Sequence, residues 1–347
     1  MTQVNVGIVG ATGYGGVELI RLLDGHPHFN IHSVYSSSQN DLPISEVYPN
    51  LSHFEYKLKE INPKEMAKEV ELVFTATPSG VSSKLVPTLI NEGLKVVDLS
   101  GDFRLKDEEL YEQWYKKPSA SLEDLEKAIY GLSEWFADEV SSADFISNPG
   151  CYPTATLLGL APLAQEKIVV SNSIIIDAKS GISGAGRGLS QLAHYAEINE
   201  NMKIYKVNKH QHIPEIESIL SRWDSEIGNV MFNTHLVPMT RGIMTTMYAQ
   251  LKEEKSIEEL HALYVQAYEA KPFVRVRKLG EFPSTKEVSG SNYCDIGLDY
   301  DERTKRVTIV SVIDNLMKGA AGQAVHNANI MLGFEENLGI NGLPVYP

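Results

Sequence analysis

The N-terminal strand–turn–helix pattern constrains the fold more than any other feature of this chain. Val4–Val9 is a short apolar, β-branched run that predicts a strand, and residues 16–24 have the spacing of an amphipathic helix. Gly10, Gly13 and Gly16 lie between the two as a G-x-x-G-x-x-G variant of the dinucleotide-binding fingerprint. Glycines at these positions permit a tight turn and a close approach of the backbone to a pyrophosphate at the helix N-terminus.

This placement of the turn, after a strand and before a helix, predicts a dinucleotide site. The alternative is a Gly-rich turn that serves only to pack the helix against the strand. The residues expected to contact the dinucleotide are Gly10, Thr12, Gly13, Tyr14, Gly15 and Gly16.

Strand and helix signals continue to alternate through the first 150 residues. Short continuous apolar runs separated by helical segments are typical of a parallel sheet covered on both faces. The predicted strands are 30–35, 71–76, 95–99 and 143–146, with a helix over 81–91. The pattern predicts an α/β fold built on a Rossmann-type doubly wound parallel sheet.

The second half of the chain has a different pattern. Strands are predicted at 173–178, 230–237, 242–251, 274–278, 292–300 and 306–312, and they suit a mixed or antiparallel sheet. Residues 292–299 alternate apolar and polar side chains, as expected for a sheet with one solvated face. An Ala-rich helix over 320–332 could pack back onto the first domain. We therefore expect a dinucleotide-binding domain of residues 1–150 plus about 315–347, and a second, α+β domain of 151–314.

Cys151 is the candidate nucleophile. It lies in the segment S-N-P-G-C-Y-P-T, which starts at Ser147, follows an apolar run and leads into a predicted helix over 154–165. On the first turn of a helix, unpaired backbone N–H groups and the helix dipole favour a thiolate and could also stabilise an oxyanion. The alternative is a buried structural cysteine. Cys294, within a predicted strand and away from any turn, is expected to be such a buried residue.

Charge and cysteine content exclude several classes of protein. The net charge is −14 and the chain has no block of basic residues, which argues against nucleic acid and anionic membranes as partners. Two cysteines in 347 residues do not form a disulfide framework, and no apolar stretch approaches the length of a membrane span. We therefore expect a soluble cytoplasmic protein. Individual arginines become informative: Arg104 and Arg241 could bind a phosphate or a carboxylate, or form surface ion pairs.

The end of the second predicted strand bears on the choice of dinucleotide. The strand runs into three serines, Ser36 to Ser38, and no carboxylate follows until Asp41. An acidic residue there would favour NAD, whereas hydroxyl groups can accept the 2′-phosphate of NADP. We therefore expect NADP(H), with Ser36 and Ser38 as contacts; a solvated serine loop is the alternative.

Two histidines could exchange a proton with the thiol. His210 and His212 lie just ahead of a predicted helix, and histidine titrates near neutral pH, as a general acid–base requires. Two histidines at this spacing could also bind a metal, but no third group of ligands with suitable spacing accompanies them. The sequence therefore favours a proton carrier without metal, and structural histidines are the alternative.

Four segments together closely resemble N-acetyl-γ-glutamyl-phosphate reductases, which share a superfamily with aspartate-semialdehyde dehydrogenases. They are 10–16, 147–154, 210–216 and 314–324, the last reading D-N-L-M-K-G-A-A-G-Q-A, and the resemblance spans essentially the whole chain. It implies that the chain reduces a small-molecule acyl phosphate with NADPH, giving an aldehyde and phosphate, in arginine biosynthesis. It also implies a homodimer or homotetramer.

The resemblance implies roles for the candidate residues. Cys151 would form a thioester, with His210 the first choice for acid–base work and His212 the second. Asn148 and the N–H of Cys151 would stabilise the oxyanion. The substrate would bind to Arg104, Arg241 and Ser183, and the nicotinamide end of the cofactor to Ser180, Gly181, Gly184 and Asn315.

Three other functions stay open at this point. An aspartate-semialdehyde dehydrogenase would use the same chemistry on a shorter acyl phosphate, although the H-x-H-x-P-E-I segment at His210 argues against it. A reductase that acts on the amino-adipyl homologue is harder to distinguish from one that acts on the glutamyl substrate, because the sequence does not show which residues form the pocket beyond the acyl phosphate. A regulator that binds NADP without catalysis would have no use for Cys151 and the histidine pair.

Overall fold

The computed structural model describes residues 3–37 and 39–346, and the chain divides into two compact units. Unit 1 comprises Met1–Gly150 and Ala320–Asn341, and unit 2 comprises Cys151–Gly319 and Gly342–Pro347. The expected domains differ from these units in two places. Residues 315–319 and the C-terminal segment from Gly342 belong to unit 2.

Unit 1 contains a seven-stranded sheet in the order β3-β2-β1-β4-β5-β7-β6, and every pair in it is parallel. The expected Rossmann-type doubly wound sheet is therefore confirmed. Its strands are β1 (Val4–Val9), β2 (Phe29–Tyr35), β3 (Leu58–Lys59), β4 (Leu72–Thr75), β5 (Lys95–Asp98), β6 (Ile129–Tyr130) and β7 (Phe145–Ser147). The two-residue strands β3 and β6 carry too little sequence pattern to be predicted.

Helices cover both faces of this sheet. On one side α3 and α4 contact each other, and on the other α12 contacts α1 and α7. The longer helices are α1 (Tyr14–Asp24), α3 (Pro63–Glu69), α4 (Ser82–Asn91), α5 (Glu108–Tyr115), α7 (Ser133–Ser141) and α12 (Gly322–Met331), with shorter ones at α2 (Ile44–Val47) and α6 (Leu122–Lys127). The expected return of the C-terminal helix to the first domain is confirmed, since α12 belongs to unit 1.

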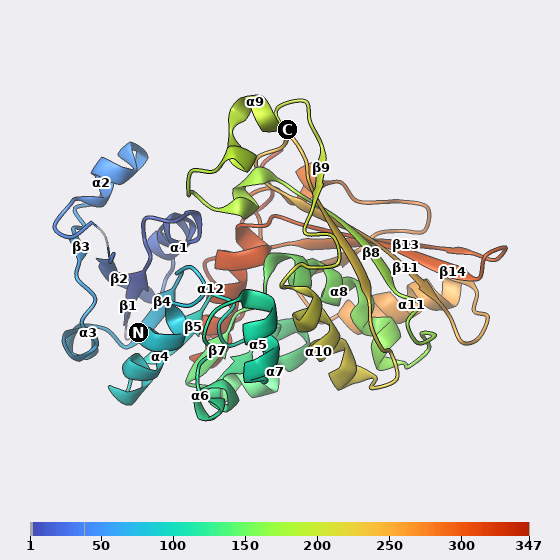
Figure 1. Ribbon diagram of the computed structural model, residues 1–347, viewed down its shortest axis with the longest axis horizontal. Helices are drawn as coiled ribbons and strands as arrows, with labels where there is room; N and C mark the ends of the chain where they lie inside the picture. The colour runs from blue at the N-terminus through green and yellow to red at the C-terminus, as the bar shows by residue number, and fades with distance from the viewer. Residues whose placement is uncertain (1–2, 38, 347) are drawn as a thin grey trace. The chain divides into compact units, whose positions relative to one another are not determined.

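The order of the strands places a ligand site in unit 1. β1 pairs with β2 on one side and with β4 on the other, so the chain reverses its direction of progress across the sheet at β1 (Figure 1). In doubly wound sheets, ligands bind beyond the carboxyl ends of the strands at such a reversal. The glycine turn follows β1 directly, so the sheet brings it to this edge.

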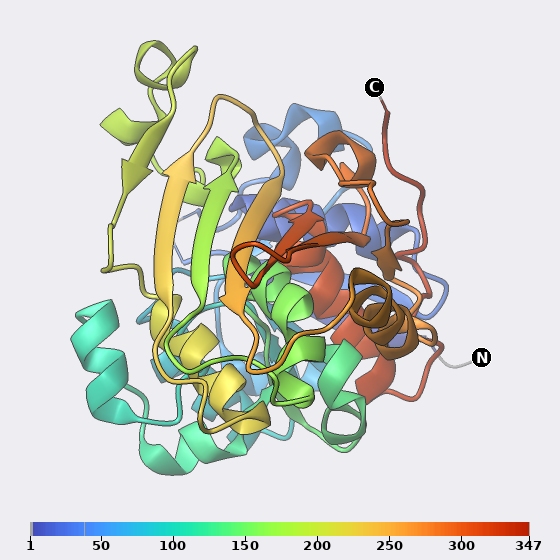
Figure 2. The same cartoon turned by 90° about the vertical axis from the view of Figure 1, so that its right-hand side faces the viewer.

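Unit 2 contains a mixed seven-stranded sheet in the order β12-β13-β14-β11-β8-β10-β9, as expected from the sequence. Its strands are β8 (Ile175–Ser180), β9 (Lys203–Tyr205), β10 (Met231–Leu236), β11 (Ile243–Gln250), β12 (Val274–Val276), β13 (Cys294–Asp301) and β14 (Arg306–Ile313). The helices α8 (Cys151–Gln165), α10 (Ile213–Trp223) and α11 (Ile257–Tyr268) lie on one face of this sheet (Figures 1 and 2). A short helix, α9 (Tyr195–Ile198), precedes β9.

The central helix of unit 2 is α8, and its side chains from Tyr152 to Ala164 are all buried. Pro162 inside the helix has no N–H to donate to the carbonyl of Leu158, four residues earlier. The hydroxyl of Tyr268 from α11 donates to that carbonyl instead, and Tyr264 donates to the neighbouring carbonyl of Gly159 at 2.6 Å. Two tyrosines therefore fix α8, which begins at Cys151, to the adjacent helix.

One expectation about the second sheet is wrong. The alternation over 292–299 suggested a solvated face, but every residue of β13 from Cys294 to Leu298 is buried. Two arginines, on and just after the neighbouring strand β12, pair with its acidic side chain: Arg275 donates to both carboxylate oxygens of Asp295, at 2.6 and 2.9 Å, and Arg277 pairs with the same side chain. A buried carboxylate with two guanidinium partners is stable inside a protein, and the sequence does not show such pairing.

Candidate functional site

The glycine turn of unit 1 is built so that only glycine fits at two positions. Gly10 has φ of +81°, and a Cβ there would lie 2.4 Å from the carbonyl oxygen of Ala76. A Cβ at Gly16 would lie 2.3 Å from the carbonyl oxygen of Gly10. The turn is therefore packed against β4 and against itself, and Gly13 becomes the N-cap of α1. No described side chain caps that end of α1, which leaves backbone N–H groups available to an anion.

The remaining cofactor candidates of unit 1 surround this turn. Thr12, Tyr14 and Gly15 are half-buried, and the hydroxyl of Tyr48 donates to the carbonyl of Thr12 at 3.0 Å. Ser36 follows β2 and is buried, with its N–H donating to the carbonyl of Lys59 at 3.1 Å. Ser38 lies outside the described residues. The turn and Ser36 thus lie at the carboxyl ends of adjacent strands.

The side chains of Arg104 and Asn148 both form hydrogen bonds within unit 1. Arg104 is 8% exposed, and its guanidinium donates to the carbonyls of Asn148 at 2.9 Å and Leu99 at 2.8 Å. The side-chain oxygen of Asn148 accepts from Asn327 at 2.9 Å, and its amide group donates to the carbonyl of Ala320 at 3.2 Å. These contacts fix the backbone and the side chain of Asn148, which lies three residues before Cys151.

A buried carboxylate anchors the same edge of the sheet. Asp98, at the end of β5, accepts hydrogen bonds from the hydroxyls of Thr75 at 2.6 Å, Ser82 at 2.7 Å and Ser100 at 2.6 Å. Burial raises the pKa of this carboxyl, and the three hydroxyls offset part of that effect. The main-chain carbonyl of Asp98 also accepts the N–H of Asn148 at 2.8 Å. Asp98 was not predicted as a site residue, and its position just before Arg104 is the signal that could have found it.

In unit 2, Cys151 is the first residue of α8, three residues earlier than the sequence suggested, and its side chain is partly exposed. The expectation that the thiol lies on the first turn of a helix is confirmed. Gly319 packs directly against it: a Cβ at Gly319 would lie 2.8 Å from the Cβ and 3.2 Å from the Cα of Cys151. Cys294 is fully buried and its sulfur lies 3.3 Å from the hydroxyl of Ser311, as expected of a structural cysteine.

The two histidines lie beside the start of α8. The ring of Tyr152 is 5.5 Å from the ring of His210 and 6.0 Å from the ring of His212, measured between centroids. Tyr205 from β9 contacts the same group, with its hydroxyl 3.1 Å from that of Tyr152 and its ring 5.7 Å from His210. Phe232 from β10 is 5.6 Å from His210. Aromatic rings therefore surround His210 on several sides.

This environment gives His210 a defined protonation state. Burial and, to a smaller extent, the positive charge of Lys206 together lower the pKa of His210 to about 3. Its Nδ1 accepts the backbone N–H of His212 at 3.2 Å, so the single proton of the neutral ring is on Nε2. Burial also raises the pKa of Tyr205 to about 12, which keeps this neighbouring phenol protonated.

The loop after β8, which contains Gly181, Ser183 and Gly184, is hydrogen-bonded to the turn that carries Arg241. The N–H of Gly181 donates to the carbonyl of Gly242 at 2.9 Å, and that of Ser183 to the carbonyl of Thr240 at 3.1 Å. Close packing explains Gly181, since a Cβ there would lie 2.7 Å from the carbonyl oxygen of Thr240. A Cβ at Gly184 would approach the hydroxyl of Ser180 at 3.0 Å, and that hydroxyl donates to the carbonyl of Gly181.

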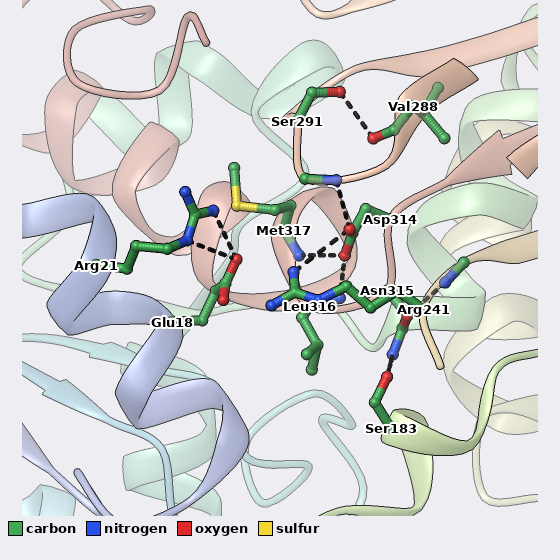
Figure 3. Close-up of polar contacts among 12 residues, drawn as sticks. Glu18, Arg21, Ser183, Arg241, Val288, Ser291, Asp314, Asn315, Leu316 and Met317 are labelled. Carbon is green, nitrogen blue, oxygen red and sulfur yellow. Dashed lines mark hydrogen bonds and ion pairs between the residues drawn. The ribbon is translucent and has the colours of Figure 1, made fainter. Parts of the chain in front are cut away.

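Asn315 joins these two loops. Its side-chain oxygen accepts the N–H of Gly242 at 2.8 Å, and its amide donates to the hydroxyl of Ser183 at 2.9 Å. The preceding residue, Asp314, lies 3.4 Å from the guanidinium of Arg241 (Figure 3). The side chain of Arg241 is 30% exposed. Five predicted residues of unit 2 therefore belong to one hydrogen-bonded cluster: Ser180, Gly181, Ser183, Arg241 and Asn315.

Several residues of unit 2 that contact the site were not predicted. Asp314 and Gly319 lie in the same D-N-L-M-K-G-A-A-G segment as Asn315. That motif is the sequence signal that could have identified them. Tyr205 had no local signal, because it comes from a three-residue strand. Within residues 3–37 and 39–346, no three His, Cys, Asp or Glu side chains form a group that could hold a metal.

Comparison with known proteins identifies two family models in the chain. Residues 5–143 match the NAD binding domain of semialdehyde dehydrogenase, and residues 151–315 match its dimerisation domain. The chain is 59% identical over 345 residues to an N-acetyl-gamma-glutamyl-phosphate reductase of Geobacillus sp. (strain WCH70), covering 99% of this chain and all of the relative. It is 57% identical, with the same coverage, to the protein of that name from Bacillus cytotoxicus.

Solved structures share the fold at much lower sequence identity. Aspartate semialdehyde dehydrogenase II of Vibrio cholerae, complexed with ASA, superposes with a TM-score of 0.73 at 16% identity, covering 96% of this chain and 99% of that one. The aspartate semialdehyde dehydrogenase of Candida albicans, solved with NADP, gives a TM-score of 0.71 at 18% identity, covering 95% and 99%. These likenesses support the two-part α/β architecture.

Proposed function

Because the chain belongs to the N-acetyl-γ-glutamyl-phosphate reductase family, we propose that it reduces N-acetyl-γ-glutamyl phosphate to N-acetylglutamate semialdehyde and phosphate with NADPH, a step of arginine biosynthesis. One observation carries the mechanism: a partly exposed thiol occupies the first residue of α8 in a chain 59% identical to such a reductase. Relatives named for the glutamyl substrate are 56–59% identical, whereas the aspartate enzymes are 16–19% identical and share only the fold. The glutamyl substrate is therefore favoured over the aspartyl one.

The thiolate of Cys151 attacks the acyl carbon of the substrate. A carbon–sulfur bond forms, the bond between the acyl carbon and the bridging phosphate oxygen breaks, and phosphate leaves with the electron pair, so the product is a thioester. When bound, NADPH supplies the hydride that reduces the thioester carbonyl. The resulting thiohemiacetal oxyanion collapses, the carbon–sulfur bond breaks, and its electrons return to sulfur as the aldehyde leaves. Backbone N–H groups at the start of α8 are the oxyanion donors in this account.

The residues of unit 1 suit a dinucleotide with a pyrophosphate. Gly10 and Gly16 leave no room for a side chain, so the backbone of the turn can approach the phosphates closely, and the N-terminus of α1 favours their charge. Ser36, at the end of β2, lies where the ribose 2′ position is recognised in this fold, and a hydroxyl there is compatible with the phosphate of NADP.

Three of the residue roles expected from the family change in this proposal. Both ends of the Asn148 amide are engaged within unit 1, so we assign this residue to positioning rather than to the oxyanion. Arg104, buried and bonded to main-chain carbonyls, is assigned the same task. Arg241 has a partly exposed side chain and is the assigned ligand of the substrate anion, with Ser183 nearby.

The third change concerns the proton carrier. His210 has a pKa of about 3 and its Nδ1 is occupied, so it is neutral at physiological pH and cannot accept the thiol proton without breaking a hydrogen bond. It can still donate a hydrogen bond from Nε2, as a neutral imidazole does in other enzymes. We therefore assign proton transfer to His212, reversing the order that the sequence suggested.

Separate substitution of the two histidines tests this assignment. His212→Gln should lower kcat by about 10²- to 10⁴-fold, the usual contribution of general acid–base catalysis. His210→Gln should lower kcat much less, because the neutral ring of His210 only donates a hydrogen bond in this account. Steady-state rates at neutral pH measure both variants. A larger loss of kcat in His210→Gln than in His212→Gln would contradict the assignment.

Gly13→Ala tests the cofactor site separately from folding. A Cβ at Gly13 would lie 3.5 Å from the nearest atom, so the free protein can hold it, and the change at the helix N-cap should cost about 1 kcal/mol or less. The added methyl group faces the position expected for the pyrophosphate, so the Kd for NADPH should rise about tenfold or more. Calorimetric titration measures this change. Gly25→Ala, at the other end of α1, is the matched control and should bind NADPH as the wild type does.

The reverse reaction tests the proposed activity itself. The protein is mixed with N-acetylglutamate semialdehyde, phosphate and NADP⁺, and the absorbance of the reduced cofactor is followed. We expect reduction that depends on phosphate, and slower reduction with the amino-adipyl and aspartyl semialdehydes. Absence of any phosphate-dependent signal, or preference for either of the other two aldehydes, would contradict the proposal.

The same family supports a proposal for the assembly and the location of the protein. The match of residues 151–315 to a dimerisation domain supports a homodimer or homotetramer formed through unit 2, and native mass measurement at micromolar concentration would distinguish the two from a monomer. No helix among the described residues is long and apolar enough to cross a membrane. A biosynthetic reductase that uses a small acyl phosphate and NADPH is proposed to act in the cytoplasm.

A further inference from the structure

Asp314 is a fully buried carboxylate that directly follows β14, and its two oxygens have different partners. Oδ1 accepts the backbone N–H groups of Leu316 at 2.9 Å and Met317 at 3.0 Å (Figure 3). Oδ2 accepts the N–H of Gly290 at 2.7 Å and lies 3.4 Å from Nη1 of Arg241. Three amide donors and one guanidinium compensate the cost of burying this charge.

The first oxygen fixes a turn that contacts the thiol. Residues Met317–Ala321 form a single π-helical turn, in which the N–H of Gly319 donates to the main-chain carbonyl of Asp314 at 3.0 Å. Such turns are rare in proteins, and those that occur often lie at functional sites. The turn brings Gly319 so close to Cys151 that even a methyl group would not fit between them. The carboxylate that caps the turn therefore sets the backbone against which the nucleophile rests.

The second oxygen fixes the arginine assigned to the substrate. The guanidinium of Arg241 is partly exposed and points to Asp314 from the turn between β10 and β11. The neighbouring Asn315 holds the next residue of that turn, Gly242, at 2.8 Å. The segment that begins at Asp314 thus restrains both the side chain and the backbone of the anion-binding turn.

From these contacts we propose that Asp314 is a positioning residue for the reaction, which orients Arg241 with one carboxylate oxygen and Cys151, through the turn at Gly319, with the other. The proposal rests on the proposed function for the role of Arg241. Its second half, the effect on the thiol, does not depend on that function. The contacts that carry both halves join residues of unit 2 alone.

Asp314→Asn tests both halves, because it keeps the size of the side chain and removes its charge. We expect the KM for N-acetylglutamate semialdehyde to rise about tenfold, as expected when a guanidinium loses its orienting partner. We also expect the rate of Cys151 alkylation by iodoacetamide at pH 7 to fall about tenfold, because the thiol loses its fixed place at the helix N-terminus. The alkylation rate is measured by loss of the thiol in peptide mass analysis, with no substrate or cofactor present.

The matched control is Asp295→Asn. Asp295 is equally buried in the same unit and also pairs with arginines, but its partners Arg275 and Arg277 contact neither Cys151 nor Arg241 in the described contacts. This variant should lower the Tm while leaving the KM and the alkylation rate within twofold of the wild type. If Asp314→Asn lowers the Tm and leaves the other two quantities unchanged as well, Asp314 is only structural and the proposal is wrong.

Two further variants separate the possible failures. Asp314→Glu, which keeps the charge but displaces it, should retain most of the substrate affinity and still slow alkylation; unchanged alkylation in this variant would also overturn the proposal. Arg241→Gln combined with Asp314→Asn should raise the KM no more than Arg241→Gln alone, since the two act on one interaction. If the wild type showed no phosphate-dependent reduction, the proposed function would fail, while the alkylation rates would still decide the role of Asp314.

Discussion

Replacing Cys151 by alanine should lower kcat/KM by about 10⁴-fold or more, because removal of a covalent nucleophile leaves only binding and oxyanion stabilisation. The thiol is partly exposed at the first residue of α8, so its loss should change the free energy of unfolding little. The phosphate-dependent reduction of NADP⁺ measures the activity, and thermal unfolding measures the stability.

The chain contains its own control for this experiment. Cys294 is the second of the two cysteines, fully buried in β13 with its sulfur 3.3 Å from the hydroxyl of Ser311. Cys294→Ala should cost about 1 kcal/mol of stability through the small cavity and leave kcat/KM within a factor of two. Full activity in Cys151→Ala, or equal loss in the two variants, would exclude a thioester on Cys151.

A methyl group at Gly319 should also lower the rate strongly. Real Cβ atoms do not approach one another to 2.8 Å, so Gly319→Ala must displace either the π-helical turn or the first residue of α8. A shift of about 1 Å at a reacting group can cost about 10²-fold in rate, and we expect a loss of that size in kcat. The same displacement should change the iodoacetamide reactivity of Cys151 in the absence of substrate.

Gly342→Ala is the control for this substitution. Gly342 also belongs to unit 2, and a Cβ added to it would have no heavy atom of the described residues within 4 Å, so alanine should be tolerated without loss of activity. Retention of wild-type kcat in Gly319→Ala would show that the turn yields without moving the thiol. The close contact would then have no role in catalysis.

The parts of this protein that could be predicted from sequence depend on local patterns. The strand, glycine turn and helix at Val4–Val9 and Gly10–Gly16 lie within one stretch of chain, and their signals are independent of distant residues. The position of Cys151 at the start of a helix was predicted for the same reason. The boundaries of β8 and β12 were shifted by a few residues, because strand ends depend on hydrogen bonds to neighbouring strands.

The parts that could not be predicted depend on burial by distant segments. The alternation over 292–299 predicts a solvated face, yet Asp295 within it is fully buried and pairs with Arg275 and Arg277 of the neighbouring strand and the residues just after it. His210 appeared the better proton carrier until the rings of Tyr152, Tyr205 and Phe232, from three different elements, enclosed it and lowered its pKa. Such environments arise only when the chain is folded, so the residue type alone could not reveal them.

The thioester is the central claim, and trapping it tests the claim most directly. The protein is mixed with N-acetyl-γ-glutamyl phosphate without NADPH, quenched in acid, digested and analysed by peptide mass. The account predicts an N-acetylglutamyl adduct on the peptide that contains Cys151, absent from Cys151→Ala and discharged when NADPH is added before the quench. Turnover of the acyl phosphate with no adduct on Cys151, or an adduct that NADPH does not discharge, would contradict it.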